Sequence, residues 1–316
     1  MKSAFAAKSL DENNRRLSSS GGVFTELAIQ TFAEGGVVFG AAFGKNPWEV
    51  RHVKVDSKSS LGLLRGAKYV RSQLGGVCAD VAGALASGRS VLFSGTPCQV
   101  AHLKSFIGEA AAETDDLLTV EVVCHGVPQD GMLERYLKDG FGDLSGIAVS
   151  FRDKANGWKN YSVVVSHEGK REAQVWWQNP FMKGYVANLY ISRQCEKCIH
   201  REGRSGADIS LGDFWGCCGL VPGFDDDGGV SLVVLHSDRG REAFERIKCR
   251  CSVVPVEYGQ AAKHNRAISE NPTPHPKRNQ FLHDLEHGIC FNDAVDRALR
   301  PMWRRFMSML KRKVGL

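Results

Sequence analysis

The sequence lacks several features that would place it in a common class of protein. Residues 1–10 contain no apolar run of signal-peptide length, and nowhere do about 18 apolar residues follow one another as in a membrane-spanning helix. No Gly-x-Gly-x-x-Gly fingerprint follows a predicted strand and no Walker-type loop is present, which disfavours a Rossmann dinucleotide site and an NTPase. We therefore expect a cytoplasmic protein whose chemistry rests on other motifs.

Charge of one sign is also scarce in the body of the chain. The net charge is +6 over 316 residues, and much of the excess lies in a basic stretch from Arg297 to Lys313. Total charge is thus no argument for nucleic acid as a partner. Met302, Phe306 and Leu310 have helical spacing within this stretch. They predict a tail helix that either packs on its own domain or contacts a partner or an anionic membrane surface.

Strand-like and helical patterns alternate along most of the chain. Apolar runs of strand length occur at 37–42, 50–55, 90–93, 117–123, 147–151, 161–166 and 230–235. Helical patterns occur at 23–29 and 77–87, and patterning weakens after about residue 255, where 271–276 is rich in proline. These patterns predict an α/β fold with a mixed sheet and flanking helices, followed by an irregular C-terminal extension that ends in a helix.

Ten cysteines are the most informative feature of the sequence, because a reducing cytoplasm keeps thiols from forming disulfides. Cys98 and Cys124 each follow a predicted strand, in segments that contain proline or glycine, and we expect the two strands to be neighbours. Cys195 and Cys198 form a Cys-x-x-Cys turn, which supplies two metal ligands while leaving amides free to donate to sulfur. These four thiols predict one Cys₄ site.

Zinc and an iron–sulfur cluster are the two candidate occupants of this site. Structural zinc usually takes two paired Cys-x-x-Cys turns, and only one is present, so a cluster is favoured. The adjacent Cys217 and Cys218 stay ambiguous, since neighbouring cysteines rarely bind one metal together. The remaining cysteines are best interpreted as core residues or incidental thiols without a role in the site: Cys78, Cys249, Cys251 and Cys290.

Two further segments have the composition of anion sites. Residues 18–22 offer serine hydroxyls and unpaired amides at a helix start, although a simple N-cap is the ordinary explanation. Arg65, Lys68 and Tyr69 combine positive charge with a ring on which a ligand can stack, and a solvated face is the alternative. Asp213 ends a predicted strand beside two aromatic residues, where it either contacts a ligand or closes the core.

Read together, these segments resemble the coenzyme F-420 hydrogenase/dehydrogenase beta subunit family. Seven motifs occur in the family's order between about residues 17 and 277. They are SSGGVF (19–24), GVVFGA (36–41), LRGAKYV (64–70), FSGTPCQ (93–99), CHGVP (124–128), SFRDK (150–154) and LGDFWG (211–216).

The resemblance implies an oxidoreductase with an FAD and a [4Fe–4S] cluster in one chain. It would pass electrons between a one-electron carrier and a two-electron acceptor, either coenzyme F-420 or another small molecule, with exopolysaccharide synthesis as a context among bacterial relatives. The cluster ligands carry over onto Cys98, Cys124, Cys195 and Cys198. The flavin contacts carry over onto Ser20, Gly21, Gly22, Arg65, Lys68, Tyr69, Ser94 and Thr96, to which we add Asp213.

The family's modules suggest a division of this chain into three parts. Residues 1–88 are the expected flavin-binding module, 89–260 the catalytic and cluster-binding module, and 261–316 a proline-containing linker with a basic tail helix. Many relatives begin with a ferredoxin-like segment bearing two cysteine quartets, whereas no cysteine precedes Cys78 here. We therefore expect either a separate ferredoxin-like donor or partner subunit, or a shortened chain.

His125, next to a predicted ligand, is the candidate catalytic residue. It either donates a proton or hydrogen-bonds a cluster sulfur, and we favour the second role. Two functions of other classes stay open. A zinc-stabilised Cys₄ binding or scaffold module would contain zinc and no flavin, and a thiol-dependent transferase would use Cys98 as its nucleophile.

Overall fold

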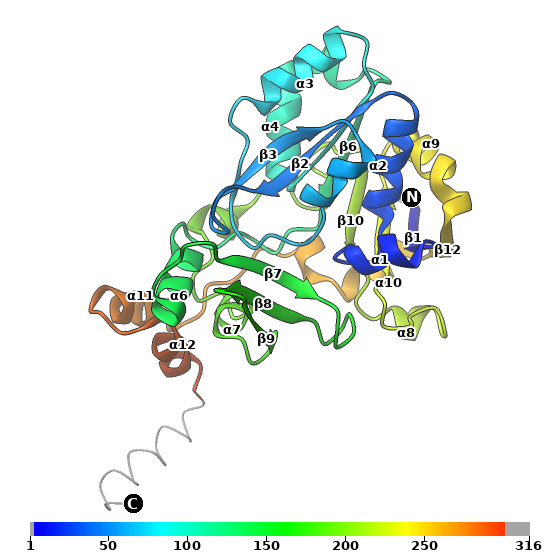
Figure 1. Cartoon of the computed structure of the whole chain (residues 1–316). Coiled ribbons are helices and arrows are strands. Elements are labelled where there is room, and N and C mark those ends of the chain that lie inside the picture. The colour runs from blue at the N-terminus through cyan, green and yellow to red at the C-terminus, as the bar shows by residue number, and fades with distance from the viewer. Residues whose placement is uncertain (1–2, 301–316) are drawn as a thin grey trace, which may run out of the picture.

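The computed structural model describes residues 3–300, and its helices and strands are labelled in Figure 1. The larger sheet consists of β1 (Ser3–Ser9), β2 (Val37–Phe43), β3 (Val50–Val55), β4 (Ser72–Gln73), β5 (Val91–Gly95), β6 (Leu117–Val122), β10 (Ile209–Asp213), β11 (Ser231–Leu235) and β12 (Cys251–Val256). The smaller sheet consists of β7 (Ala148–Asp153), β8 (Ser162–His167) and β9 (Lys170–Val175).

The α-helices of the described residues are α1 (Glu12–Leu17), α2 (Val23–Ala33), α3 (Val77–Ala86), α4 (Pro97–Ile107), α5 (Glu109–Ala112), α6 (Met132–Phe141), α7 (Pro180–Val186), α8 (Cys217–Leu220), α9 (Asp238–Ile247), α10 (Tyr258–Lys263), α11 (Arg278–Glu286) and α12 (Phe291–Leu299). Short 3₁₀ turns are η1 (Lys58–Leu63), η2 (Arg193–Lys197), η3 (Lys248–Arg250) and η4 (Arg266–Ile268).

The larger sheet has the order β12-β1-β11-β10-β6-β5-β2-β3-β4. Its centre, β10-β6-β5-β2, is parallel, while β11, β1, β12 and β3 join in antiparallel pairs. The central strands are apolar on both faces because helices cover both sides. Residues of α2 and α9 pack on one face and residues of α3 and α4 on the other, as Figure 1 shows. The predicted α/β fold with a mixed sheet is confirmed.

The first strand was not among the predicted ones. β1 lies between β11 and β12 and pairs antiparallel with both, for example Ala6 with Leu232 and with Val254. Ala6 and Ala7 are fully buried there. Small alanine side chains carry little strand preference, so the location of β1 depends on its two partners, which follow more than 200 residues later.

The smaller sheet forms a second layer with the C-terminal helices. Aromatic and aliphatic residues of β7, β8, α6, α7, α11 and α12 form one core, centred on Phe181, Tyr190, Phe281 and Phe291. Figure 1 shows this unit below the larger sheet. The expected irregular extension after residue 255 is therefore more regular than its pattern indicated, and it ends in α12. The predicted helix around Met302 to Leu310 lies outside the described residues.

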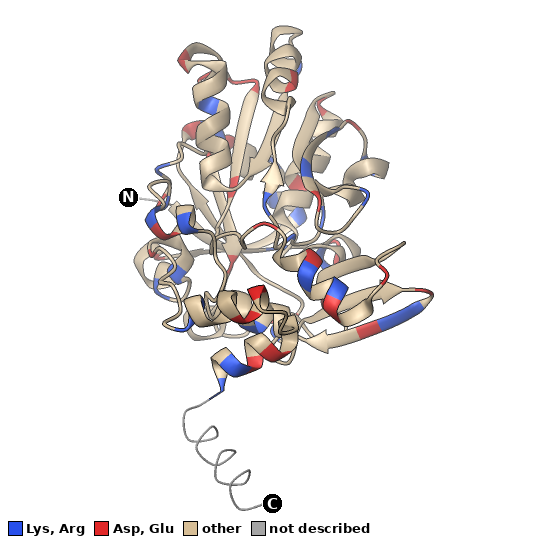
Figure 2. Cartoon of the chain, turned by 90° about the vertical axis from the view of Figure 1, so that its left-hand side faces the viewer, with Lys and Arg blue, Asp and Glu red and all other residues tan. Residues whose placement is uncertain are grey.

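Charged side chains of both signs are interspersed over the molecule. Figure 2 shows Lys and Arg alternating with Asp and Glu on the helices of one side and along β9. Among residues 3–300, no helix combines the length and the apolar character that crossing a membrane requires.

Candidate functional site

The four predicted ligands come from three segments that the fold brings together. β5 and β6 are adjacent parallel strands, as the sequence predicted, and Cys98 and Cys124 follow their carboxyl ends. That edge is where open α/β sheets bind ligands. Cys195 lies in η2 and Cys198 directly follows it. The sheet thus presents two cysteines at one edge, and the loop before β10 adds the other two.

Cys98 lies in the first turn of α4 rather than in the loop that the sequence suggested. Pro97 occupies the first helical position and Gln99 closes a capping box by accepting a hydrogen bond from the Thr96 amide at 2.9 Å. Both features start a helix at this point. Thr96 Oγ1 lies 3.2 Å from the Cys98 sulfur. A thiolate at a helix N-terminus is stabilised by the helix dipole.

The four thiols act on one another electrostatically. Burial raises the pKa of the Cys124 thiol to about 12, and the charges of Cys195 and Cys98 contribute to the rise. Burial also raises the pKa of Cys195, and Cys98 and Cys198 contribute there too. The amide of Val127 opposes this second shift by donating to the Cys195 sulfur at 3.5 Å. Each cysteine of the quartet is therefore electrostatically coupled to at least one other.

A single zinc ion and a [4Fe–4S] cluster require different spacings of their four sulfur ligands. Among the described residues, no three His, Cys, Asp or Glu side chains are gathered closely enough to hold one metal ion. Four sulfurs at about 2.3 Å from one zinc ion would be less than about 4 Å apart. The ligands of a [4Fe–4S] cluster bind four different irons and lie farther apart.

Arg201 connects the Cys124 loop to the C-terminal segment. Its Nη1 donates to the carbonyl of Cys124 at 2.6 Å and also to that of Ala267. Its Nη2 donates to the His125 carbonyl at 3.1 Å, and its Nε to Asn271 Oδ1 at 2.6 Å. The side chain is buried, so one guanidinium joins the backbone at Cys124 and His125 to the segment that contains Ala267 and Asn271. Sequence reasoning missed it, because an isolated arginine has no motif.

The proline-rich segment packs against the quartet instead of acting as a free linker. Arg278, which begins α11, forms an ion pair with Glu196, the residue after Cys195. Asn188 donates to the Thr273 carbonyl at 3.0 Å, and its Oδ1 lies 2.6 Å from His125 Nε2. This segment therefore contributes to the position of both cysteine loops.

The surroundings of His125 lower its pKa and fix the position of its ring. Burial lowers its pKa, with the Arg201 charge as a further cause, while the Asn188 contact opposes the change. Its ring centroid lies 5.2 Å from that of Tyr185, and Tyr185 donates to the Gly126 carbonyl at 2.7 Å. The side chain is thus fixed beside Cys124.

A cavity of about 450 Å³ lies between the α1–α2 connection and β7. Its walls include Arg16, Arg65, Arg152 and Lys154, four cations, with Asp153 as the acidic residue among them. The Nε atoms of Arg65 and Arg152 are buried and have no hydrogen-bond partner within residues 3–300. Buried donors are normally satisfied. Two residues of the cavity wall therefore each keep one buried donor that no described protein atom satisfies.

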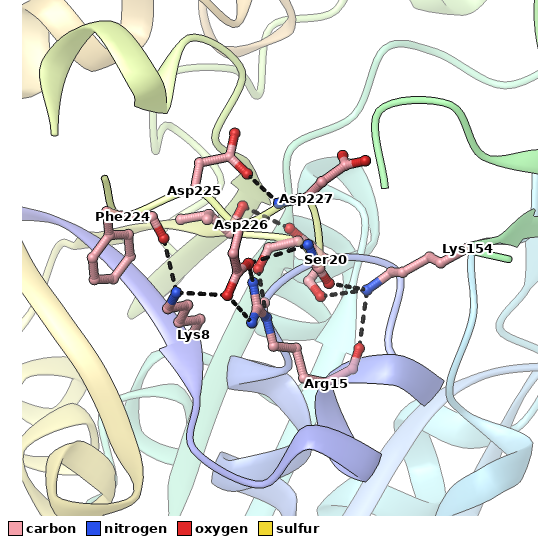
Figure 3. Close-up of polar contacts among 12 residues, drawn as sticks. Lys8, Arg15, Ser20, Lys154, Phe224, Asp225, Asp226 and Asp227 are labelled. Carbon is pink, nitrogen blue, oxygen red and sulfur yellow. Dashed lines mark hydrogen bonds and ion pairs between the residues drawn. The ribbon is translucent and has the colours of Figure 1, made fainter. Parts of the chain in front are cut away.

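Arg152 and Lys154 belong to the SFRDK motif but were not among the predicted site residues. Arg152 pairs with Asp213 at 2.9 Å, and although burial opposes its charge, this carboxylate raises the pKa of Arg152. Lys154 Nζ contacts the carbonyls of Arg15 and Ser20 at 2.9 and 2.8 Å, as Figure 3 shows. Burial lowers the pKa of Lys154 to about 7, with Arg152 and Arg15 adding to the effect.

The Ser20-Gly21-Gly22 turn has close structural contacts of its own. Ser20 Oγ donates to the Val230 carbonyl at 2.8 Å. A Cβ on Gly21 would lie 2.4 Å from the Ala7 carbonyl oxygen, so only glycine fits there. Gly22 has a φ of 89° and is the N-cap of α2. The turn presses against β1 and β11.

The next three predicted flavin contacts are Arg65, Lys68 and Tyr69. Arg65 lines it, and Lys68, with a pKa lowered to about 8 by burial, donates to the carbonyls of Arg65 and Gly66 at 2.9 and 3.0 Å. Tyr69 receives a hydrogen bond from Arg152 at 3.3 Å and packs against Tyr185 with centroids 4.9 Å apart.

Ser94 is the last residue but one of β5, and Asp213 is the last residue of β10. Both therefore lie at the carboxyl ends of the central strands. The Ser94 carbonyl lies 3.0 Å from His52 Nε2. Asp213 accepts hydrogen bonds from Arg152 and from Trp158 Nε1 at 3.3 Å, so its carboxylate fixes the guanidinium that borders the cavity. Of the nine predicted flavin contacts, only Arg65 lines the cavity. Tyr69 and Asp213 each accept a hydrogen bond from Arg152, which also lines it.

Comparison with known proteins agrees with this description. The family model that describes the C terminus of the coenzyme F-420 hydrogenase/dehydrogenase beta subunit matches residues 88–256. A chain of the F-420-reducing [NiFe] hydrogenase complex from Methanosarcina barkeri has a similar fold, with a TM-score of 0.57 and 18% sequence identity over 90% of this chain and 93% of that chain. No curated protein sequence matches.

The mixed α/β sheet, with cysteines and a cationic cavity near its carboxyl edge, agrees with an oxidoreductase-related protein. The chain belongs to the coenzyme F-420 hydrogenase/dehydrogenase beta subunit family, whose model covers more than half of it. The predicted family is confirmed.

Proposed function

We propose that this chain is an FAD- and [4Fe–4S]-dependent oxidoreductase that passes electrons from a ferredoxin-like donor to a two-electron acceptor. The observation that supports the proposal is that Cys98 and Cys124 follow adjacent parallel strands, while the amide of Val127, in the loop after Cys124, donates to the Cys195 sulfur. Family membership supports an oxidoreductase-related role.

The quartet has the donor chemistry that an iron–sulfur cluster requires. Four thiols lie at strand and helix ends, and the Val127 amide donates to the Cys195 sulfur. The buried Arg201 cation would offset the negative charge of thiolates around Cys124. A bound cluster would supply one-electron transfer. His125 would then support the site by position and hydrogen bonding, because its neutral form is favoured.

The cavity has the donor chemistry that a dinucleotide cofactor requires. The orphaned Nε atoms of Arg65 and Arg152 would donate to a diphosphate, and Lys154 would add positive charge when protonated. A bound FAD would supply the exchange between one-electron and two-electron transfer. Tyr69 lies between the two regions, since it contacts Arg152 on one side and Tyr185 on the other. Ser20, Gly21, Gly22, Lys68, Ser94 and Thr96 would shape the surrounding loops.

Partners and acceptor follow from the same arrangement. The acceptor would be coenzyme F-420 or another small molecule, with polysaccharide biosynthesis among the contexts, and the donor a separate ferredoxin-like protein or subunit. A hollow of about 540 Å³ beside the Cys-x-x-Cys turn, lined by Arg71, Asp130, Ser192 and Gln194 among others, leaves this side open to such a donor. The division of the chain into modules at residues 88 and 260 stays a prediction. β1, from the first of these modules, pairs with β11, from the second, so both contribute to one sheet.

The test is the cofactor content of protein purified without oxygen. We expect FAD bands with a broad shoulder near roughly 400 nm, about four irons per chain and no zinc. Serine at Cys98, Cys124, Cys195 or Cys198 should abolish the shoulder, whereas Cys249→Ser, at another exposed thiol, should keep it. A colourless protein with about one zinc per chain would support the Cys₄ scaffold instead. Loss of activity on alkylation of Cys98, without any visible absorbance, would support the thiol-dependent transferase.

A further inference from the structure

A thiol and an amine meet on the surface, outside the quartet and the cavity. Lys159 lies in the loop between β7 and β8, and Cys218 lies in α8. Lys159 Nζ is 3.4 Å from the Cys218 sulfur, and both residues are exposed. The two side chains come from segments 59 residues apart, so the fold and not the sequence makes this pair.

One carboxylate oxygen holds both groups in place. Asp225 Oδ2 accepts a hydrogen bond from Lys159 Nζ at 2.8 Å and from the Cys218 thiol at 3.1 Å. The Asp225 side chain is only 2% exposed, and its Oδ1 accepts from the Asp227 amide at 2.9 Å, a bond drawn in Figure 3. An anchored carboxylate therefore keeps amine and sulfur within reaction distance.

The backbones that carry the pair are also joined. The Asp227 carbonyl accepts from the Trp158 amide at 2.8 Å, and Asp227 Oδ1 accepts from the Lys159 amide at 2.9 Å. The rings of Trp158 and Trp215 stack with centroids 4.5 Å apart. Bond formation would thus require movement of two side chains and little movement of the chain.

We propose that Lys159 and Cys218 form a reversible covalent link when the protein meets a hydroperoxide. In the first step the thiol sulfur is oxidised and the peroxide reduced, so that Cys–SH and H₂O₂ give Cys–SOH and water. In the second step the lysine nitrogen displaces the hydroxyl group, which forms an S–N bond and releases water and one proton. The product is a sulfenamide, two hydrogens lighter than the starting pair.

The surroundings select Cys218 over its neighbour in the sequence. Cys217 is fully buried in the core beside Phe214 and Val230, where peroxide has no access. Cys218 is exposed and lies beside a cationic side chain, the setting in which protein thiols react with oxidants. Lys154 is part of the cavity wall, and Lys159 lies in the loop that follows it. The link would therefore connect this loop covalently to α8.

Peptide mapping of the full-length chain after treatment with limiting hydrogen peroxide tests the proposal. We expect the tryptic peptide of residues 155–170 joined to the one that contains Cys218, at the summed mass minus two hydrogens, and release of both by a thiol reductant. Lys159→Arg, which keeps the charge beside Asp225, should give no joined peptide and at least tenfold more dimedone adduct at Cys218. Cys217→Ser should still form the link.

Two results would overturn the proposal. One is equal dimedone labelling of Cys218 in the wild type and in Lys159→Arg. The other is a Cys217–Cys218 disulfide as the only product that has lost two hydrogens. Neither result depends on FAD or an iron–sulfur cluster, so the outcome is separate from that of the proposed function.

Discussion

Replacement of Arg152 is the most informative perturbation of the candidate site. Its guanidinium donates to both oxygens of Asp213, at 2.9 and 3.3 Å, and to Tyr69. It also lies 4.2 Å from the ring centroid of Tyr161. Arg152 lines the cavity, and its Nε is buried and has no hydrogen-bond partner among residues 3–300. Arg152→Met removes all these contacts, while Arg152→Lys keeps the charge and loses the planar geometry.

The structure gives the expected size of each effect. The Arg152 side chain is 4% exposed and that of Asp213 is 19% exposed. Loss of one partner of a buried ion pair costs about 3–5 kcal/mol, and we expect about 3 because Asp213 keeps the Trp158 contact. Arg152→Met should therefore lower Tm by about 4–5 °C in a chain of 316 residues. A lost charge-assisted hydrogen bond of about 1.5–3 kcal/mol should weaken FAD binding about 10- to 150-fold.

The assay combines denaturant unfolding of the apo protein with FAD titration by fluorescence quenching. A double-mutant cycle with Asp213→Asn isolates the ion pair, and we expect its two members to be coupled in unfolding by at least about 1 kcal/mol. Arg152→Lys should recover most of the stability but only part of the affinity, because a lysine does not donate bidentately.

Two outcomes would refute this reasoning. The first is unchanged FAD affinity in a folded Arg152→Met variant, which would remove the cavity from the flavin site. The second is strict additivity of the Arg152 and Asp213 substitutions, which would mean that the observed ion pair contributes nothing to stability. Lys183→Met, at an exposed ion pair with Asp296, is the matched control and should change both readouts little.

Two other substitutions and one change of pH test residues that hold the site in place. Gly21→Ala should destabilise the fold by more than about 2 kcal/mol in urea unfolding, because its methyl group would meet backbone atoms of β1 and β11. Burial lowers the pKa of His52 to about 4. Because the unfolded chain binds this proton more readily, the protein should lose up to about 3 kcal/mol of stability as pH falls from about 6.5 to 4. Urea unfolding at several pH values measures this loss. Arg201→Met should speed alkylation of the Cys124 thiol in the apo protein, followed by mass spectrometry, by loosening its loop.

The first two predictions each have a control variant, and the third has an outcome that would contradict it. Gly35→Ala, at a glycine with no neighbour near its missing Cβ, separates strain at φ 75° from a clash and should cost less than Gly21→Ala. The unfolded histidine binds a proton before the folded one does, so the loss of stability on acidification should disappear in His52→Gln. Equal alkylation rates at Cys124 in wild type and Arg201→Met would contradict the positioning role of Arg201.

The sequence determined the fold class, most strands and the four cysteines, because each depends on local pattern. Val50–Val55 was predicted at its observed bounds, since an apolar run of strand length needs no distant partner to be recognised. The cysteines that follow β5 and β6 could be expected together, because parallel neighbours end at the same edge. The motif around residue 152 was visible too, although its role was not.

Only the tertiary structure decided the contacts that hold the site. β1 has no strand pattern of its own and is fixed by partners that follow it by more than 200 residues. Arg201, Arg278 and the proline-rich segment support the cysteine loops through hydrogen bonds to backbone and to distant side chains. The two unpartnered Nε atoms became meaningful once burial was known. Local sequence encodes periodicity and turns, whereas burial and long-range pairing arise when the whole chain packs.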